Sequence, residues 1–230
     1  MHKDCVVHEN LEQGTEEWFA ARNGLLTASE VHLILTATLK VADNDKTRAH
    51  VYEIAAQRIN NYTEPSYVGE AMERGHVDEI KSRDLYSEKI QPVDEVGFIT
   101  RDFGDFTLGF SPDGALSFDD AGIECKSRIQ KHHLATMINN EVPKEHIMQV
   151  QTGLLVTGWE YMDYLSWSGG MPLWRIECKP IAEYQDAILN AAGEFEAKVK
   201  EVIEKYGNRL SEAGYVGETE REELIGEVYV

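Results

Sequence analysis

Hydrophobic residues recur at helical spacing through most of the first 90 positions of the chain. The stretch "GTEEWFAARNGLLTASEVHLILT" predicts two short helices broken at its Asn-Gly pair, with Thr15 capping the first and Thr27 or Ser29 capping the second. A third helix is predicted over about 45–60, before the turn-rich "NNYTEPS", and a longer one over 68–88. Trp18 is expected to pack the first helix onto the core.

Short β-rich runs replace the helical pattern after Pro92. "VDEVGFITR", "FTLGFSPDGAL" and "AGIECKS" predict a meander of three strands separated by Gly, Asp and Pro. "PKEHIMQVQTGLLVTG" returns to helical spacing and stops at Gly158, while the segment around His132 and His133 is predicted to be a polar loop. "YMDYLSWSG" and "LWRIECK" predict two more strands, and "IAEYQDAILNAAGEFEAKVKEVIEKYG" predicts a long amphipathic last helix.

This order of elements predicts an α/β fold, with a central mixed β-sheet flanked by helices and a helical region at the N-terminus. A chain of 230 residues is near the upper size of a single domain. We expect one domain over 1–212, with an N-terminal helical part at 1–66 and an α/β core at 67–207, followed by an acidic tail at 213–230.

The charge of the chain restricts how it could bind nucleic acid. There are 22 Lys and Arg against 41 Asp and Glu, which gives a net charge of −19. General affinity for nucleic acid depends on cations that neutralise phosphates, so this balance argues against a general binder. Any such function would need a local basic groove, bound cations, or both.

Other sequence features indicate a cytoplasmic protein without a metal–thiolate cluster. The N-terminal segment has neither the basic start nor the apolar core of a secretory signal, and no run is apolar enough to span a membrane. The three cysteines are too few and too widely spaced for a disulfide framework or a four-thiolate cluster.

The tripeptide Glu-Cys-Lys occurs twice, at 124–126 and at 177–179, and only the first has the neighbours of a metal site. Glu124 and Lys126 point to the same face of a strand, and Asp113 lies in the Pro-Asp-Gly turn of the preceding predicted strand. Two carboxylates held close together repel each other unless a cation lies between them, and oxygen ligands favour Mg²⁺ or Mn²⁺ over zinc. A divalent cation there could polarise a phosphate and activate water, with Lys126 offsetting the developing charge.

Each of these residues also has a plain structural interpretation. Asp113 could be only a turn residue, and Glu124 with Lys126 only an exposed pair on a strand, because short motifs of this kind occur by chance. The joint occurrence of the three in consecutive predicted strands favours the metal site. The second tripeptide lacks a Pro-Asp turn, so Glu177 and Lys179 are predicted to be an ordinary pair on one face of a strand.

Four motifs together resemble a known family. "PDG…GIECK" looks like the PD-(D/E)XK nuclease pattern, and "QGTEEWFAARNGLLTASEV" is similar to the opening signature of the lambda exonuclease and YqaJ-like viral recombinase branch. "ERGHVDE" and "HIMQVQ" follow in the same order, and the likeness covers about 11–200. The resemblance implies a restriction-endonuclease-like fold.

The resemblance also implies a role for each matching residue. Asp113, Glu124, the backbone carbonyl of Cys125 and Glu79 would bind the metal, Lys126 would be the catalytic lysine, and Gln149 would help to order the site. The residues that would grip a DNA 5′-phosphate are Arg22, Ser29, Thr27 and Ser111. From the residues alone, Glu79 could equally lie on a solvated helix face, Gln149 could be an ordinary helix residue, and Thr27 and Ser29 could be only caps.

The activity implied by the resemblance is a Mg²⁺-dependent exonuclease on double-stranded DNA, with Mn²⁺ able to substitute. It would digest 5′→3′ from 5′-phosphorylated ends and leave 3′ overhangs for phage-type recombination by single-strand annealing, beside a partner annealing protein. A homotrimeric ring around the DNA is also implied, and it could keep an acidic exterior around a basic channel. No iron–sulfur cluster is expected, because the related nucleases that hold one carry four cysteines.

Two other functions remain open from the sequence. A PD-(D/E)XK endonuclease or repair nuclease would use the same residues without needing DNA ends. A non-enzymatic acidic mimic of DNA would suit the net charge, but it would have no use for Lys126.

Overall fold

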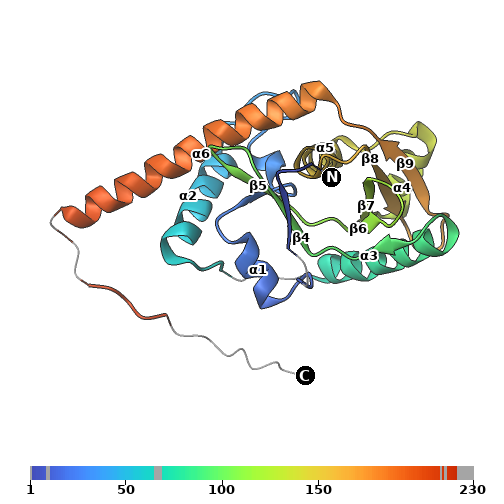
Figure 1. Ribbon diagram of the computed structural model, residues 1–230, viewed down its shortest axis with the longest axis horizontal. Helices are drawn as coiled ribbons and strands as arrows, with labels where there is room; N and C mark the ends of the chain where they lie inside the picture. The colour runs from blue at the N-terminus through green and yellow to red at the C-terminus, as the bar shows by residue number, and fades with distance from the viewer. Residues whose placement is uncertain (1, 9–10, 65–68, 213, 215–216, 222–230) are drawn as a thin grey trace.

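The computed structural model describes residues 2–8, 11–64, 69–212, 214 and 217–221, and it shows two mixed β-sheets joined by helices (Figure 1). The helices of the described residues are α1 (Glu16–Arg22), α2 (Asp45–Asn60), α3 (Glu70–Lys89), α4 (Gln130–Asn139), α5 (Lys144–Thr157) and α6 (Ala182–Ser211), with a 3-10 turn at Val31–Leu33. The strands are β1 (Cys5–His8), β2 (Leu26–Thr27), β3 (Val93–Asp94), β4 (Phe98–Asp102), β5 (Thr107–Phe110), β6 (Gly114–Leu116), β7 (Ala121–Ser127), β8 (Tyr161–Trp167) and β9 (Trp174–Cys178). The predicted α/β class is confirmed.

The five-stranded sheet has the order β3-β6-β7-β8-β9 and lies between α3 and α5. Side chains on β7 alternate between its two faces. Ile123 and Cys125 pack on the α3 side with Tyr86 and Leu165 in a small buried cluster. The intervening residues of β7 therefore face α5, and that is the face on which Glu124 and Lys126 lie.

The smaller sheet has the order β1-β4-β5-β2, and α5 links it to the larger one. Helix α5 contacts β4 and β5 of the smaller sheet, β8 of the larger sheet and also α6. Its apolar residues, among them Val150 and Leu154, belong to the main core together with Phe110 and Met162 from the two sheets. The main core thus fixes the position of one sheet relative to the other.

The predicted three-strand meander is wrong in one respect, because the region forms five strands that divide between the two sheets. The run "FTLGFSPDGAL" breaks after Phe110, where β5 ends, and resumes at Gly114, where β6 begins in the other sheet. Pro112, at the break, has no N–H to contribute to a strand ladder. The crossing from one sheet to the other therefore places Asp113 at the start of β6, beside β7.

The N-terminal region contains one of the two predicted short helices. The Oγ1 of Thr15 accepts a hydrogen bond from the Trp18 N–H, so the predicted cap of α1 is confirmed. The predicted second helix is wrong: Thr27 pairs with Gly109 of β5 in a parallel ladder, and only a 3-10 turn follows. Neither Thr27 nor Ser29 caps that turn, because the cap residue is Glu30 and no side chain bonds there.

Two further expectations are corrected. The segment around His132 and His133 is helix α4, and His133 is fully buried, with its ring nitrogens within 2.8 Å of Ser166 Oγ and 3.0 Å of the Pro172 carbonyl oxygen. Trp18 is only half-buried, and no residue of α1 is fully buried. Its indole N–H donates to the Gly97 carbonyl oxygen and to Ser111 Oγ.

A bidentate ion pair joins α2 to the long helix α6, which lie side by side in Figure 1. The guanidinium of Arg58 donates to both carboxylate oxygens of Glu196, at 2.7 and 2.8 Å, and its Nε donates to the Gly24 carbonyl oxygen at 2.8 Å. Gly24 has φ +71°, and a Cβ there would lie 2.7 Å from the Arg58 side chain. A glycine after α1 therefore permits this contact.

The predicted division into parts remains a prediction. The boundary expected at 66–67 and most of the acidic tail expected at 213–230 lie outside the described residues. No helix in the part of the chain that the structure describes is long and apolar enough to cross a membrane.

Replacement of Arg58 by Met should lower the free energy of unfolding by about 2–4 kcal/mol, because the largely buried Glu196 would lose its bidentate partner and keep only the longer contact with Lys200, at 3.5 Å. Urea denaturation followed by circular dichroism measures the change. Arg48→Met on the same helix is the control: Arg48 pairs with Asp43 and Asp45 at the surface, and its loss should leave the urea midpoint near the wild-type value. Equal midpoints for the two variants would contradict the prediction.

Candidate active site

Glu124 and Lys126 form an ion pair on the α5 face of β7, as their spacing predicts. The Lys126 Nζ lies 2.5 Å from the Glu124 Oε1, and only 1% of the Glu124 side chain is exposed. Gln149, from α5, donates its Nε2–H to the same Glu124 oxygen at 2.6 Å. The structure therefore brings three of the predicted residues into direct contact.

Asp113 lies next to this pair because β6 and β7 are antiparallel neighbours. The register pairs Gly114 with Ile123, so the residue before β6, Asp113, falls opposite Glu124. The backbone N–H of Cys125 donates to Asp113 Oδ2 at 2.5 Å, while the Cys125 side chain is buried on the opposite face. The predicted approach of Asp113 to Glu124 across adjacent strands is thus observed.

The acids of the site outnumber the cations, and their pKa values reflect this. Burial raises the pKa of Glu79, on α3, to about 7, and the negative charge of Asp113 adds to the rise. Burial also raises the pKa of Glu124 to about 8, although Lys126 opposes the shift, and burial raises the pKa of Asp113. For Lys126, burial acts to lower the pKa, but Glu124 and Asp113 outweigh it and raise the pKa. The acids of the site carry more negative charge than Lys126 can balance, and a bound cation would reduce this excess.

The donor atoms suit a hard divalent cation. The second carboxylate oxygen of Glu124, Oε2, is buried and makes no hydrogen bond within the described residues. Asp113 supplies another carboxylate, and oxygen ligands of this type favour Mg²⁺ or Mn²⁺. Among the described residues no three His, Cys, Asp or Glu side chains already form a metal cluster. A cation here would accordingly need backbone carbonyl or water oxygens to complete its shell.

A second polar cluster forms around Arg22, and it contains all four residues predicted to bind a phosphate. One Arg22 nitrogen donates to Ser111 Oγ at 3.1 Å and another donates to Thr27 Oγ1 at 3.2 Å. Thr27 Oγ1 is in turn 3.2 Å from Ser29 Oγ. The Arg22 guanidinium lies 4.2 Å from the centre of the Trp18 ring, which fixes its plane.

This cluster, called the Arg22 cluster below, has the chemistry of an anion site. Arg22 supplies a forked cation and the three hydroxyl groups supply further donors. The negative charge of Glu30 offsets part of the positive charge of Arg22. The Glu30 Oε2 also accepts hydrogen bonds from both the backbone N–H and the hydroxyl of Thr27. The hydroxyl groups can turn toward an incoming oxyanion, so the cluster could grip a terminal phosphate.

Arg128, His146 and Tyr164 form a third polar group beside the ion pair, and the sequence did not single them out. The His146 Nδ1 lies 2.7 Å from the Tyr164 hydroxyl, and Arg128 donates to the His146 Nε2 at 3.3 Å. Burial lowers the pKa of His146 to about 4, with Lys126 and Arg128 adding to the effect. Because Arg can only donate, a neutral His146 accepts at Nε2 and carries its proton on Nδ1.

Two sequence signals could have located this group. Arg128 follows Lys126 by two residues, so it belongs on the same face of the strand. His146 precedes Gln149 by three residues, one turn of helix. Tyr164 gave no such signal, because its place depends on the parallel pairing that sets it opposite Glu124 in β8.

The second Glu-Cys-Lys string has different surroundings, as predicted. Glu177 and Lys179 form a pair with 3.4 Å between Oε1 and Nζ, and their side chains are 42% and 73% exposed. Asp163, the nearest upstream acid, is buried in β8 and accepts from the Tyr86 hydroxyl at 2.6 Å. Asp163 lies opposite Glu177 in the β8–β9 ladder, and Arg175 lies within 3.4 Å of Asp163 and 3.9 Å of Glu177, so Asp163 is already paired and the pair at Glu177 is an ordinary surface pair.

Comparison with known proteins gives one family and several structural neighbours. The family model described as a YqaJ-like viral recombinase domain matches residues 17–160, more than half of the chain. No curated protein matches the chain. The match contains Asp113, Glu124, Lys126, Gln149 and the whole Arg22 cluster.

Solved exonuclease structures share the fold. The alkaline exonuclease of Laribacter hongkongensis is 27% identical, with a TM-score of 0.74 over 86% of this chain and 98% of that chain. Its complex with dAMP is 28% identical, with the same TM-score and coverage. A phage-related exonuclease of Haemophilus somnus, 10% identical with a TM-score of 0.57 over 79% of this chain and 96% of that chain, shows likeness of fold alone.

The raised pKa values of Glu79 and Glu124 predict that a divalent cation displaces protons from the site. With pKa values of about 7 and about 8, both groups are partly protonated at pH 7 without metal. Ligand carboxylates must ionise, so binding of Mn²⁺ at pH 7 should release about one proton, and affinity should rise with pH up to about 8. Isothermal titration calorimetry in buffers of different ionisation enthalpy measures the number released.

Glu79→Gln is the matched variant, because it removes one of the two titrating groups and leaves Glu124 in place. It should release fewer protons than the wild type under the same conditions. Heats of binding that do not depend on the buffer would contradict the raised pKa values.

Proposed function

The chain belongs to the YqaJ-like viral recombinase family of nucleases, and on that premise we propose that it is a Mg²⁺-dependent exonuclease that digests double-stranded DNA from 5′-phosphorylated ends. The proposal rests on the observation that two polar sites lie close together. A cation-deficient pair of carboxylates with a buried lysine lies beside the Arg22 cluster, which has the chemistry to hold a terminal phosphate.

Nucleases of this family use a divalent metal, and the residues of this chain fit one. Asp113, Glu124 and the carbonyl of Cys125 would hold it, with Glu79 nearby from α3. When bound, such a cation polarises the scissile phosphate and lowers the pKa of a water molecule. Mn²⁺ could replace Mg²⁺, because the donors are all oxygen atoms.

The protein side chains have separable tasks in this proposal. Lys126 remains charged between Glu124 and Asp113, so it can orient the attacking water and stabilise negative charge that develops on the phosphate. Gln149 holds the Glu124 carboxylate in one orientation through their 2.6 Å hydrogen bond. Glu79, on α3, would be ionised once the cation is bound, so it can help to hold the cation or accept a proton from the attacking water.

The Arg22 cluster would set where cleavage begins. If the terminal 5′-phosphate occupies it, the next phosphodiester along the strand reaches Asp113 and Glu124, and mononucleotides leave in the 5′→3′ direction. The complementary strand would then remain as a 3′ overhang for a single-strand annealing protein in phage-type recombination. A ring of three subunits would hold an acidic protein on DNA by enclosing it, with basic residues toward the channel.

Asp113→Asn and Lys126→Met should each reduce Mg²⁺-dependent degradation of linear duplex DNA by at least about 100-fold, through loss of a metal ligand or of charge stabilisation. The matched control is Lys179→Met, in the second Glu-Cys-Lys string, which should keep wild-type activity. Gel assays with Mg²⁺ or EDTA measure the loss. Degradation by both site variants at the wild-type rate would refute the site, and cleavage of closed circular plasmid would indicate an endonuclease.

Arg22→Gln should raise the KM for 5′-phosphorylated duplex by about 10- to 100-fold, the size expected for a lost charge-assisted bond to phosphate. The KM for the 5′-hydroxyl duplex should change little, because that end offers no charge to Arg22. Initial rates on the two matched substrates give the ratio. A wild-type enzyme that does not distinguish the two ends would exclude the Arg22 cluster as the 5′-phosphate site.

A further inference from the structure

A polar cavity of about 480 Å³ opens beside the candidate active site. Residues from α3, from the link between β7 and α4, from the start of α4 and from the segment after β8 line it. They are Arg74, Asp78, Arg128, Ile129, Gln130, Lys131, Ser168 and Gly169. We call it the basic cavity, because three of its side chains are cations and one is an acid.

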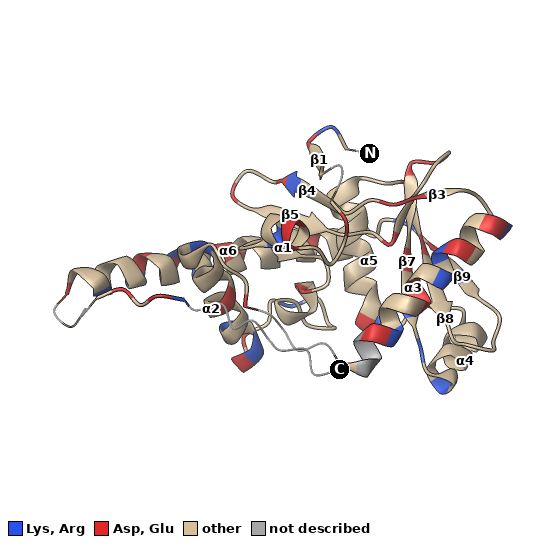
Figure 2. Cartoon of the chain, turned by 90° about the horizontal axis from the view of Figure 1, so that it is seen from below, with Lys and Arg blue, Asp and Glu red and all other residues tan. Residues whose placement is uncertain are grey.

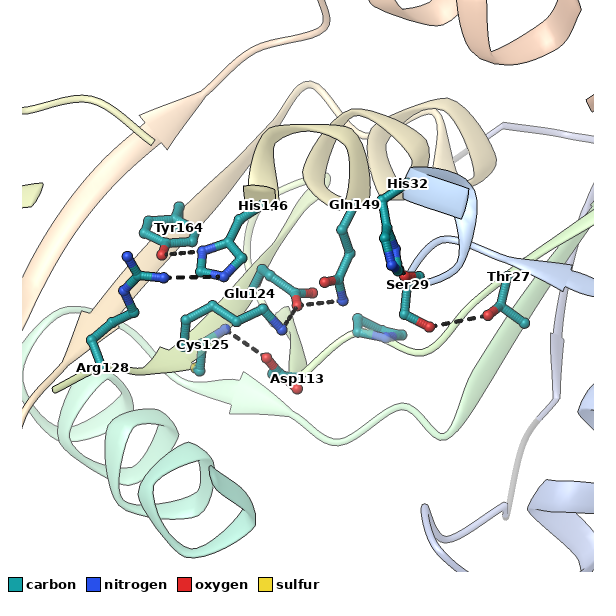
Figure 3. A network of polar contacts seen from close by, with 12 residues as sticks. Thr27, Ser29, His32, Asp113, Glu124, Cys125, Arg128, His146, Gln149 and Tyr164 are labelled. Atoms are coloured by element: carbon teal, nitrogen blue, oxygen red, sulfur yellow. Dashed lines mark hydrogen bonds and ion pairs between the residues drawn. The ribbon is translucent and has the colours of Figure 1, made fainter. Parts of the chain in front are cut away.

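The basic cavity lies on the other side of the catalytic residues from the Arg22 cluster. Figure 3 shows Arg128 on one side of Glu124 and Asp113, and Thr27 with Ser29 on the other. Arg128 is held in place by hydrogen bonds to His146 and to Glu145, at 3.3 and 3.0 Å. The candidate metal site is therefore flanked by a group of cations on one side and an anion-binding cluster on the other.

Positive charge in the basic cavity exceeds negative charge among its lining residues. Arg74 and Lys131 are exposed, and no ion pair is found for either within the described residues. Asp78 opposes them, although its carboxylate accepts a hydrogen bond from Ser127. Figure 2 shows Lys and Arg positions at the start of α4 and on the near end of α3.

The start of α4 adds to the attraction for an anion. This ten-residue helix begins at Gln130, after Ile129, and no side chain caps it. Its first N–H groups thus point out of the helix without intrahelical partners, and the helix dipole places partial positive charge there. Arg128 also has a buried Nε–H without a hydrogen-bond partner among the described residues. The polar cavity, its cations and the uncapped start of α4 all favour the same type of ligand, an oxyanion.

The line of side chains along β7 and just past its end suggests which oxyanion it is. Glu124, Lys126 and Arg128 follow one another at two-residue steps along one face, about 7 Å apart. This step is comparable to the rise of two nucleotides in a DNA strand, at about 3.4 Å each. A strand that lies across Glu124 and Lys126 would therefore bring a later phosphate to Arg128.

We propose that the basic cavity binds a backbone phosphodiester of the cleaved DNA strand, on the side of the scissile bond away from the 5′ end. This inference rests on the proposed function for the direction of the strand. The Arg22 cluster, the carboxylate site and the basic cavity then contact successive parts of one strand. Arg74 and Lys131 supply affinity without touching the reacting atoms.

The test measures DNA binding without cleavage. The double variant Arg74→Gln/Lys131→Gln is titrated with a fluorescent 5′-phosphorylated duplex in EDTA over a series of salt concentrations. Affinity should fall at least several-fold, and the slope of log K against log salt should be shallower by about 1, as expected for the loss of one phosphate contact. Lys179→Gln/Lys205→Gln, which changes the net charge equally at exposed sites, should keep the wild-type slope.

A third variant separates the loss of a phosphate contact from damage to the fold. Asp78→Asn removes the acid of the basic cavity but keeps an oxygen that can accept from Ser127. It should bind the same duplex several-fold more tightly than the wild type, a gain that a damaged fold would not produce.

Two results would overturn the proposal. In the first, the Arg74/Lys131 variant matches the Lys179/Lys205 control in affinity and salt slope. In the second, it binds duplex normally but loses affinity for free 5′-deoxyadenosine monophosphate, which would make the cavity a site for mononucleotide. If the wild type binds as predicted but never hydrolyses DNA, the proposed nuclease function fails and the basic cavity stands.

Discussion

The buried ion pair between Glu124 and Lys126 is the interaction on which the rest of the site depends. A carboxylate with 1% of its side chain exposed is costly unless it is paired and hydrogen-bonded. Lys126 and Gln149 satisfy one of its oxygens, whereas the other has no partner within the described residues. Burial raises the pKa values of Glu124, Asp113 and Glu79, and the negative charge of Asp113 adds to the rise for Glu124 and Glu79. The fold thus holds a cluster of carboxylates that a divalent cation would stabilise.

The two-sheet arrangement explains how this site is positioned relative to the Arg22 cluster. The ion pair sits on the five-stranded sheet, the Arg22 cluster sits at the edge of the four-stranded sheet, and α5 contacts both. Pro112 interrupts the strand that runs between the sheets, so Ser111 belongs to the Arg22 cluster and Asp113 to the carboxylate site. Only Pro112 separates the two sites along the chain, and a repacking of α5 would move one site relative to the other.

Local patterns in the sequence were sufficient for residues whose neighbours are close in sequence. The alternation of side chains along β7 predicted that Glu124 and Lys126 lie on one face, and the Pro-Asp-Gly turn pointed to Asp113. Helix α2 also begins at the predicted position, where Asn44 caps it. The failures share one physical cause, dependence on distant partners. The two-residue strand at Thr27 exists only because Gly109 lies beside it, and His133 is buried because β8 covers it. Tyr164 could not be found without the parallel register of β7 and β8.

The acidity of the chain is compatible with DNA binding because binding energy depends on contacts with phosphate rather than on net charge. Counterions are released only where cations meet phosphates, and surface charges more than about 8–10 Å away are screened at physiological salt. The basic residues of the site are individually held by acids, as Arg22 is balanced by Glu30 and Arg128 by Glu145. These acids lower the affinity of each contact for phosphate, so the strand would be held by several weak contacts placed along it. Weak, repeated contacts let a strand advance by one nucleotide, whereas a single strong phosphate site would hold it in place.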